Sequence, residues 1–197
     1  QEDNYNFVKI DLRIESQVEE LFKNHVPDIV YHFAALTSPQ YNQENQELAI
    51  ESNFKVTQNI VKNLSEQSHL IFLSTDKVFN GSNLFPNEED KTNPDFFYGK
   101  LKVQCEMLIQ RQIKRHHILR LPIVHSFADN HSKSFIDKTF FALKKGESVE
   151  IFNNVERCFV KLNELIDFLN LLKTNKNYGV YHLGSDKMSY FDRVRIL

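Results

Sequence analysis

Tryptophan is absent from the 197 residues, and cysteine, glycine and proline are scarce, with two, five and five residues. The cysteines, Cys105 and Cys158, are far apart in the chain, so they form no metal-binding spacing and predict free thiols. No apolar run approaches the ~20 residues of a membrane helix. The start of the chain lacks the basic and then apolar layout of a signal peptide. We therefore expect a cytoplasmic protein with no metal site and no membrane partner.

A large excess of either charge is also missing. The formal net charge is −2, and the chain carries no block of basic residues, which argues against a nucleic-acid partner. Hydrophobic residues make up 41% of the sequence and charged residues 25%, values typical of a soluble globular protein. A chain of 197 residues is long enough for a domain with a substantial core.

Strand-like and helix-like hydrophobic patterns alternate along the chain. Strands are predicted at residues 7–12, 29–36, 69–75, 117–124, 149–152 and 180–185. Helices are predicted at 15–25, at 43–65, from Tyr98 onward, around 134–145 and across 162–172, with an Asn-, Pro- and acid-rich loop at 76–96. This alternation indicates an α/β fold, in which helices cover the faces of a parallel sheet.

Ligands of such sheets bind at the carboxyl ends of the strands, so the residues there are the candidate site. They are Asp11, Ala34 to Thr37, Ser74 to Lys77, and Pro122. The small side chains of Ala34 and Ala35 allow a flat ligand to approach the backbone, and a hydroxyl at Ser74 or Thr75 can hydrogen-bond a substrate carbonyl. Each feature also has a structural interpretation, because Ser-Thr strand ends are common and an Ala-Ala pair allows tight packing.

Tyr98 and Lys102 are four residues apart, so on a helix they share one face. A lysine cation held near a phenol favours the phenolate, and it lowers a pKa that otherwise lies near 10. The pair is therefore a candidate for proton transfer at neutral pH. The alternative is a solvated helix start, in which Tyr98 packs through its ring and Lys102 lies in water.

Motif-like segments run through nearly the whole chain. They are "KIDLR", "VYHFAA", "ESNFKVTQNIV", "STDKVFNG", "NEEDKTNPDFFYGKLKVQCE", "LRLPIV", "ERCFVKLNEL" and "GVYHLGS". Together they resemble the extended short-chain dehydrogenase/reductases, and most of all the branch of the dTDP-4-dehydrorhamnose reductases, which act on nucleotide sugars. The tyrosine–lysine spacing alone is a weak signal, whereas the spacing from Thr75 to Tyr98 with the loop motif between them is specific. The resemblance implies a Rossmann-like, doubly wound parallel sheet.

The resemblance also implies a role for each matching residue. Tyr98 would be the catalytic acid/base, Lys102 would lower its pKa and hold the nicotinamide ribose, and Thr75 would orient the substrate carbonyl. Substrate binding would involve Thr75, Asp76 and Arg157, and the arginine would contact the diphosphate. The family usually has an acidic residue directly after this arginine, and here Cys158 replaces it. The cofactor, NADP or NAD, would be bound by Asp11, Leu12, Ala34, Ala35, Asn53, Ser74, Tyr98, Lys102 and Pro122.

The Gly-rich turn that seats the cofactor pyrophosphate in this family has no counterpart here. The five glycines are dispersed at positions 81, 99, 146, 179 and 184. We therefore expect a segment of a longer protein that lacks the first βαβ unit. Residues 1–125 would be a truncated NAD(P)-binding Rossmann domain, and residues 126–197 a partial, small C-terminal substrate-binding region interleaved with late Rossmann elements. The choice between NAD and NADP stays open.

The leading functional prediction is an NAD(P)-dependent reductase of a 4-keto nucleotide sugar in deoxysugar or surface-polysaccharide synthesis. Lys77 keeps an alternative open, because some nucleotide-sugar 4,6-dehydratases carry an Asp-Lys pair where this chain has Asp76-Lys77. The structural interpretation of Lys77 is a solvated loop lysine. A nucleotide-sugar dehydratase or epimerase with bound NAD is thus one alternative, and a non-catalytic NADP-binding regulatory subunit is another. The expected partners are a nucleotide sugar and, by resemblance, a second copy in a homodimer.

Overall fold

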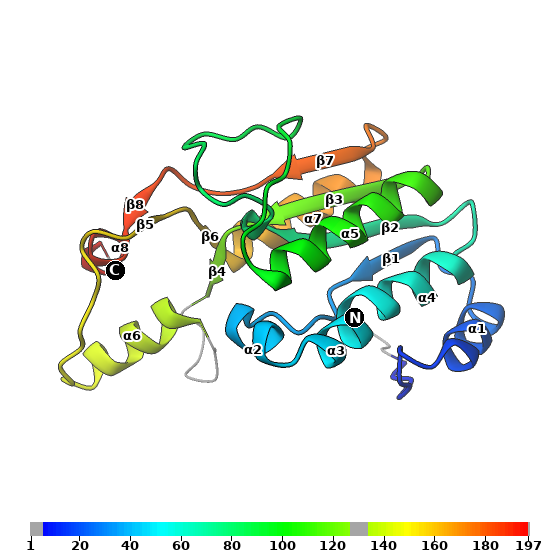
Figure 1. Ribbon diagram of the computed structural model, residues 1–197, viewed down its shortest axis with the longest axis horizontal. Helices are drawn as coiled ribbons and strands as arrows, with labels where there is room; N and C mark the ends of the chain where they lie inside the picture. The colour runs from blue at the N-terminus through cyan, green and yellow to red at the C-terminus, as the bar shows by residue number, and fades with distance from the viewer. Residues whose placement is uncertain (1–5, 127–133, 197) are drawn as a thin grey trace, which may run out of the picture.

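The computed structural model describes residues 6–126 and 134–196, which form an α/β structure (Figure 1). In chain order the elements are α1 (Glu15–Asn24), β1 (Ile29–His32), α2 (Pro39–Glu44), α3 (Gln46–Ala49), the π-helix η1 (Ile50–Lys55), α4 (Val56–Asn63), β2 (His69–Thr75), the 3-10 helix η2 (Asp76–Val78), α5 (Phe97–Gln112), β3 (His116–Leu121), β4 (Ile123–His125), α6 (Phe135–Lys144), β5 (Glu156–Arg157), β6 (Phe159–Lys161), α7 (Leu162–Thr174), β7 (Gly179–His182), β8 (Met188–Ser189) and α8 (Tyr190–Arg195). Across these described ranges, no helix is long and apolar enough to cross a bilayer.

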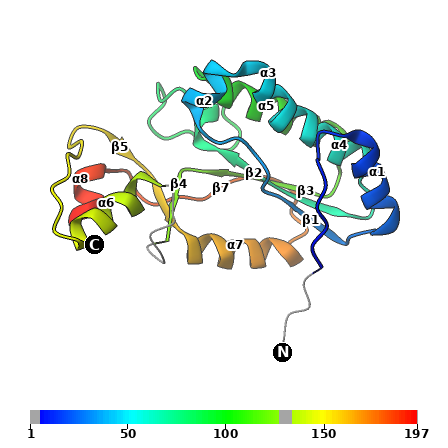
Figure 2. The same ribbon diagram turned by 90° about the horizontal axis from the view of Figure 1, so that it is seen from below.

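A four-stranded parallel sheet in the order β1-β2-β3-β7 forms the centre of the molecule. Helices α4 and α5 cover one face of this sheet and α7 lies on the other, as Figure 2 shows. The short strands form two further pairs, β4 with β6 in parallel and β5 with β8 antiparallel. The prediction of an α/β fold around a parallel sheet is therefore confirmed.

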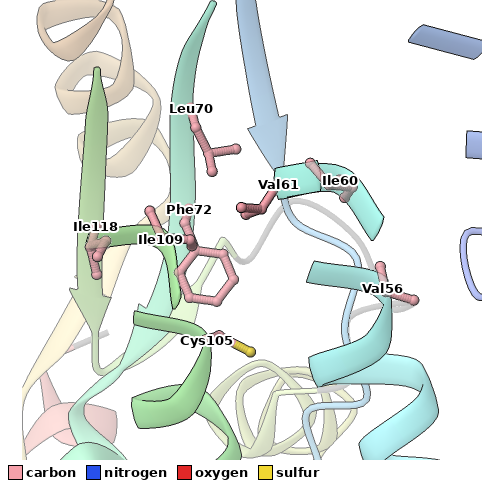
Figure 3. Packing of buried hydrophobic residues seen from close by; sticks show 8 residues of the cluster. All are labelled: Val56, Ile60, Val61, Leu70, Phe72, Cys105, Ile109 and Ile118. Atoms are coloured by element: carbon pink, nitrogen blue, oxygen red, sulfur yellow. The ribbon is translucent and has the colours of Figure 1, made fainter. Parts of the chain in front are cut away.

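The core has two halves because successive side chains of a strand point to opposite faces of the sheet. On the face covered by α4 and α5, buried residues from the sheet and both helices pack together (Figure 3). They are Val56, Ile60, Val61, Leu70, Phe72, Cys105, Ile109 and Ile118. The next residue of β3, Leu119, faces α7 and packs with Leu121 and Leu165. Strands buried on both sides explain the continuous apolar runs in the sequence.

Two predicted strands are wrong. Residues 7–12 have no strand structure, and side chains satisfy part of their backbone: Gln17 accepts from the Asp11 amide at 2.8 Å and Asn59 donates to the Leu12 carbonyl at 2.9 Å. Residues 149–152 are also irregular, and Phe152 is 62% exposed. An apolar pattern favours a strand only where a neighbouring strand completes its hydrogen bonds.

The single helix predicted at 43–65 is divided into α2, α3, η1 and α4. Its start lies earlier than predicted because Ser38 caps α2 by accepting the Tyr41 amide at 3.2 Å, and Pro39 occupies the first helical turn. The π-helical segment η1 contains Asn53, and such segments are frequent at functional sites.

The strand predicted at 117–124 is interrupted at Pro122 and becomes β3 and β4. Proline has no amide hydrogen for a ladder bond, which favours a break at this position. β3 belongs to the main sheet, whereas β4 pairs with β6 in a separate one. The chain therefore changes sheets at Pro122, a residue of the candidate site.

Candidate active site

A pocket of about 550 Å³ lies at the carboxyl ends of β1, β2 and β3. Its lining comes from these strand ends, from α5 and from the C-terminal part of the chain: Phe33, Ala35, Thr37, Pro39, Leu73, Ser74, Thr75, Asp76, Lys77, Tyr98, Lys102, Leu121, Pro122, Ile123, Val124, Ser134, Phe135, Arg157 and Tyr190. The location agrees with the rule that parallel sheets bind ligands at this edge. Among the predicted site residues, Asp11, Leu12, Ala34 and Asn53 are outside this lining.

Lys102 lies in the wall of the pocket with its side chain turned toward β2. It is 4% exposed, and its Nζ donates to the backbone carbonyl of Leu73 at 2.7 Å. The same ammonium lies 4.3 Å from the centre of the Phe72 ring, within the range of a cation–π contact. Burial lowers the pKa of Lys102 to about 8, against the smaller raising effects of Cys105 and Glu106. The alternative of a solvated lysine is therefore wrong.

Tyr98 is buried beside this lysine on α5, with 6% of its surface exposed. Burial raises the pKa of its phenol, and the negative charge of Asp76 and then Cys105 add to the effect. The net direction is opposite to the lowering predicted from the sequence because desolvation dominates, and the part of Lys102 in stabilising the phenolate stays a prediction. At neutral pH the phenol is protonated and can act as a proton donor.

The hydroxyl residues at the end of β2 have different partners. Thr75 accepts the Lys77 amide at 3.2 Å, and its hydroxyl donates to Asp76 at 3.2 Å. The Ser74 hydroxyl instead donates to the buried carboxylate of Glu106 on α5, behind the pocket. Thr75 therefore lies next to the charge of Asp76, while Ser74 joins the pocket wall to α5.

Position 99, next to Tyr98 in the first turn of α5, has no room for a side chain. A Cβ atom at this position would lie 2.2 Å from the backbone oxygen of Lys77 and 2.9 Å from the Cβ of Pro94. The first turn of α5 consequently packs directly on the loop that carries Lys77. The glycine permits this close backbone approach.

Replacing Gly99 by alanine is expected to destabilise the protein by about 1–2 kcal/mol, because overpacking costs more than the ~1 kcal/mol that alanine gains in a helix interior. Chemical denaturation measures the effect. Gln104→Ala, at an exposed position of the same helix, is the control and should be nearly neutral. A more stable Gly99→Ala variant would show that the contact with Lys77 is not tight.

Asn53 holds the backbone behind the pocket. Its side-chain oxygen accepts the Leu36 amide at 2.8 Å, and its nitrogen donates to Asn42 at 2.8 Å and to the Leu36 carbonyl at 3.2 Å. Its own carbonyl accepts the Thr57 hydroxyl at 2.7 Å, which in turn contacts His32 at the end of β1. Asn53 therefore positions the turn after β1, the segment that includes Ala35.

Asp11 and Leu12 lie apart from the pocket lining. Asp11 forms an exposed ion pair with Arg13, and the hydrogen bonds from Arg13 lower the pKa of its carboxyl group to about 2. Leu12 packs partly buried against the core on the α4 and α5 side, where Asn59 binds its carbonyl. The structure therefore separates these residues from the catalytic candidates.

The C-terminal part of the chain adds residues that the sequence interpretation missed. Phe135 and Tyr190 line the pocket and contact each other edge to face, with ring centres 5.2 Å apart. Two caps could have indicated the helix starts that carry them: Ser134 accepts the Asp137 amide and Ser189 accepts the Asp192 amide.

Two cations line the same pocket as Tyr98. Arg157 and Lys77 line both the main pocket and an adjoining one of about 320 Å³. Arg157 donates to the Glu156 carbonyl at 3.2 Å. Lys77 is half-buried, unlike the solvated loop lysine considered from the sequence, and this burial lowers its pKa. The arrangement can attract an anionic group at the junction of the two pockets.

The sheet order and the pocket at its carboxyl edge place the chain among the Rossmann-like α/β proteins. Residues 3–195 match the model of the family described as "RmlD substrate binding domain". The match covers nearly all of the sequence, so the chain belongs to this family.

Several known proteins are similar to this chain in sequence or in fold. Methionine adenosyltransferase 2 subunit beta of Danio rerio is 30% identical over 140 residues, which cover 71% of this chain and 43% of that protein. The structure of a dTDP-4-dehydrorhamnose reductase from Bacillus anthracis with NADP superimposes with a TM-score of 0.86 at 23% identity, covering 95% of this chain and 67% of that one. The Bordetella bronchiseptica enzyme WbmG with NAD gives 0.82 at 18% identity, covering 96% and 61%.

The family model defines the family, and the structural similarities define the fold. The chain spans less than half the length of the Danio rerio subunit that it matches. Structural relatives contain either NADP or NAD.

Proposed function

We propose that the protein is an NAD(P)-dependent reductase of a 4-keto nucleotide sugar, similar to the dTDP-4-dehydrorhamnose reductases. The observation that carries the proposal is the meeting of Thr75, Tyr98 and Lys102 in one pocket at the carboxyl edge of the sheet. Family membership and the likeness to a reductase structure add support.

The pocket suits the nicotinamide half of the cofactor. Ala35 and Pro122 supply small apolar surfaces at the strand ends, and Lys102 supplies a buried cation for ribose hydroxyls. When bound, the reduced nicotinamide supplies the hydride. The residues named as cofactor-binding but outside this lining, Asp11, Leu12 and Ala34, would act elsewhere along the cofactor, and Asn53 would act through the turn that it holds.

In the proposed reaction Thr75 hydrogen-bonds the substrate carbonyl oxygen and fixes the face of the carbonyl carbon. As that carbon gains hydride, Tyr98 donates its phenolic proton to the oxygen, so the ketone becomes an alcohol. The cation of Lys102 stabilises the phenolate that is left. Arg157, with Lys77 beside it, would bind the diphosphate of the substrate, and Asp76 would bind the sugar.

Two other functions have specific support. Asp76 and Lys77 are both in the pocket lining, which favours a dehydratase or epimerase that retains its NAD. The 30% identity to a protein named as a subunit favours a non-catalytic, NADP-binding partner.

A homodimer through η1 and α5 is proposed from the apolar groove lined by Phe54, Met107 and Leu108. Sedimentation at the monomer mass would contradict it.

The test is to incubate the full-length protein with NADPH or NADH and a panel of 4-keto nucleotide sugars, and to follow the absorbance of the reduced nicotinamide. Substrate-dependent loss of absorbance supports the reductase. Product formed from a nucleotide sugar without a keto group, with no net oxidation of the cofactor, indicates the dehydratase or epimerase. Cofactor binding with no turnover in either assay indicates the binding subunit.

A further inference from the structure

A buried ion pair lies directly behind the pocket, between Glu106 on α5 and Arg120 on β3. Arg120 Nη2 is 2.8 Å from Glu106 Oε2, and Arg120 Nε is 3.2 and 3.3 Å from the two carboxylate oxygens. The side chains are 6% and 3% exposed. Charges this deeply buried require partners for their hydrogen-bonding groups, so the neighbours of the pair are informative.

On one side the ion pair holds the pocket wall. The hydroxyl of Ser74 donates to Glu106 Oε1, the same oxygen that faces Arg120 Nε. Ser74 lies in the pocket lining next to Thr75. The position of this strand end is therefore tied to α5 through a charge-assisted hydrogen bond.

On the other side the ion pair holds the long loop between η2 and α5. Arg120 Nη1 donates to the Glu88 carbonyl at 3.4 Å and to His182 Nε2 at 3.3 Å. A guanidinium can only donate, so this nitrogen of His182 accepts and the ring is neutral. The His182 amide donates to the Glu88 carboxylate at 2.9 Å, and the Arg120 guanidinium lies 5.2 Å from the centre of the Phe79 ring.

We propose that Arg120, paired with Glu106, is a positioning residue that fixes the loop of residues 79–88 against the pocket. The tip of this loop has little packing of its own, since Leu84 and Phe85 are 62% and 81% exposed. The loop begins directly after η2, whose residues Asp76 and Lys77 line the pocket. Contacts at Phe79 and Glu88 therefore add to the contacts of Lys77 with Thr75 and Gly99 that place these residues. The inference rests on the proposed function only for its effect on substrate binding.

The first experiment measures hydrogen–deuterium exchange in the full-length protein carrying Glu88→Ala, with Glu89→Ala as the matched control one residue away. Glu88 is exposed, so its removal should leave the core intact. We expect at least tenfold faster exchange at the His182 amide and across residues 79–88, with α4 unchanged. Arg120→Lys, which keeps the charge but loses the planar fork, should accelerate the same segment. Glu88→Ala leaves the Arg120 contacts with the Glu88 carbonyl and the Phe79 ring in place, so the role of Arg120 is decided by Arg120→Lys and by Phe79→Leu, which removes the ring beside the guanidinium. Unchanged exchange across residues 79–88 in whichever of these two variants folds overturns the inference.

The second experiment uses the reductase assay. Glu88→Ala should raise the KM for the nucleotide sugar about threefold to tenfold and change kcat less than twofold, because the loop places binding residues and not the proton donor. An unchanged KM overturns the effect on the pocket. Absence of turnover in the unaltered protein refutes the proposed function instead, and the exchange result then decides the loop assignment alone.

Discussion

Replacing Lys102 by methionine is expected to make the protein more stable at pH 7, by about 2 kcal/mol, while removing its activity. Burial lowers the pKa of Lys102 from its ordinary 10.5 to about 8, a difference that corresponds to a cost of about 3 kcal/mol for the charged form. The loss of the hydrogen bond to the Leu73 carbonyl offsets roughly 1 kcal/mol. Methionine fills much of the same volume without the charge.

The pH dependence gives this prediction its sign. Between about pH 8 and 10.5 the unfolded chain keeps a proton that the folded lysine has lost, so stability rises with pH in this window. The difference in unfolding free energy between the unaltered protein and Lys102→Met should therefore shrink from pH 7 to pH 10. Urea denaturation at several pH values measures it. Lys100→Met, exposed on the same helix, should show no such trend; a destabilised Lys102→Met at pH 7 would refute the argument.

Tyr98→Phe is expected to lower kcat in the reductase assay by about 10²–10⁴-fold, the usual contribution of a positioned proton donor. The raised pKa of the buried phenol keeps Tyr98 protonated through neutral pH, which is the state needed to donate to the developing alkoxide. The ring remains in place, so the free energy of unfolding should change by less than about 1 kcal/mol.

The control for this substitution is Tyr41→Phe, which removes a phenol at a 43% exposed position on α2. Its kcat should equal that of the unaltered protein. The comparison is made by steady-state kinetics with saturating reduced cofactor. If Tyr98→Phe retained full turnover, another group would have to supply the proton, and the assignment of the pocket as a reductase site would lose its basis.

The sequence predicted best those elements that pattern alone determines. β2 matches the predicted strand at 69–75, since a strand buried on both faces is a continuous apolar run. The hydrophobic stripe from Tyr98 onward predicted a helix equally clearly, and α5 spans Phe97–Gln112. The division of the 43–65 helix was not predicted, because neither the break at Asn45 nor the change to i→i+5 hydrogen bonds in η1 is marked by a glycine or a proline in the sequence. The strand predicted at 7–12 is absent for another reason. A strand needs a neighbouring strand to complete its hydrogen bonds, and a local hydrophobic pattern does not show whether that neighbour exists.

For the site, topology was more informative than chemistry. Strand-end reasoning put Ala35, Thr75 and Pro122 at one edge, and they share the pocket with Tyr98. The direction of the Tyr98 pKa was mispredicted, because spacing shows that a lysine is near and burial decides the balance. The pairing of Arg120 was also missed, although a charge inside the apolar strand "HILRLPIV" already required a buried partner.

Pro122 divides one stretch of chain between two separately paired sheets, and the pocket lies at this joint. Within the described ranges β3 and β4 have different ladder partners, and the segment after β7 ties the two sheets together, because the Leu183 amide donates to the Arg120 carbonyl and the Ser185 amide to the Phe159 carbonyl. A bound molecule that touches both Thr75 of β2 and Val124 of β4 spans the two sheets, so its fit depends on the angle that these backbone bonds maintain.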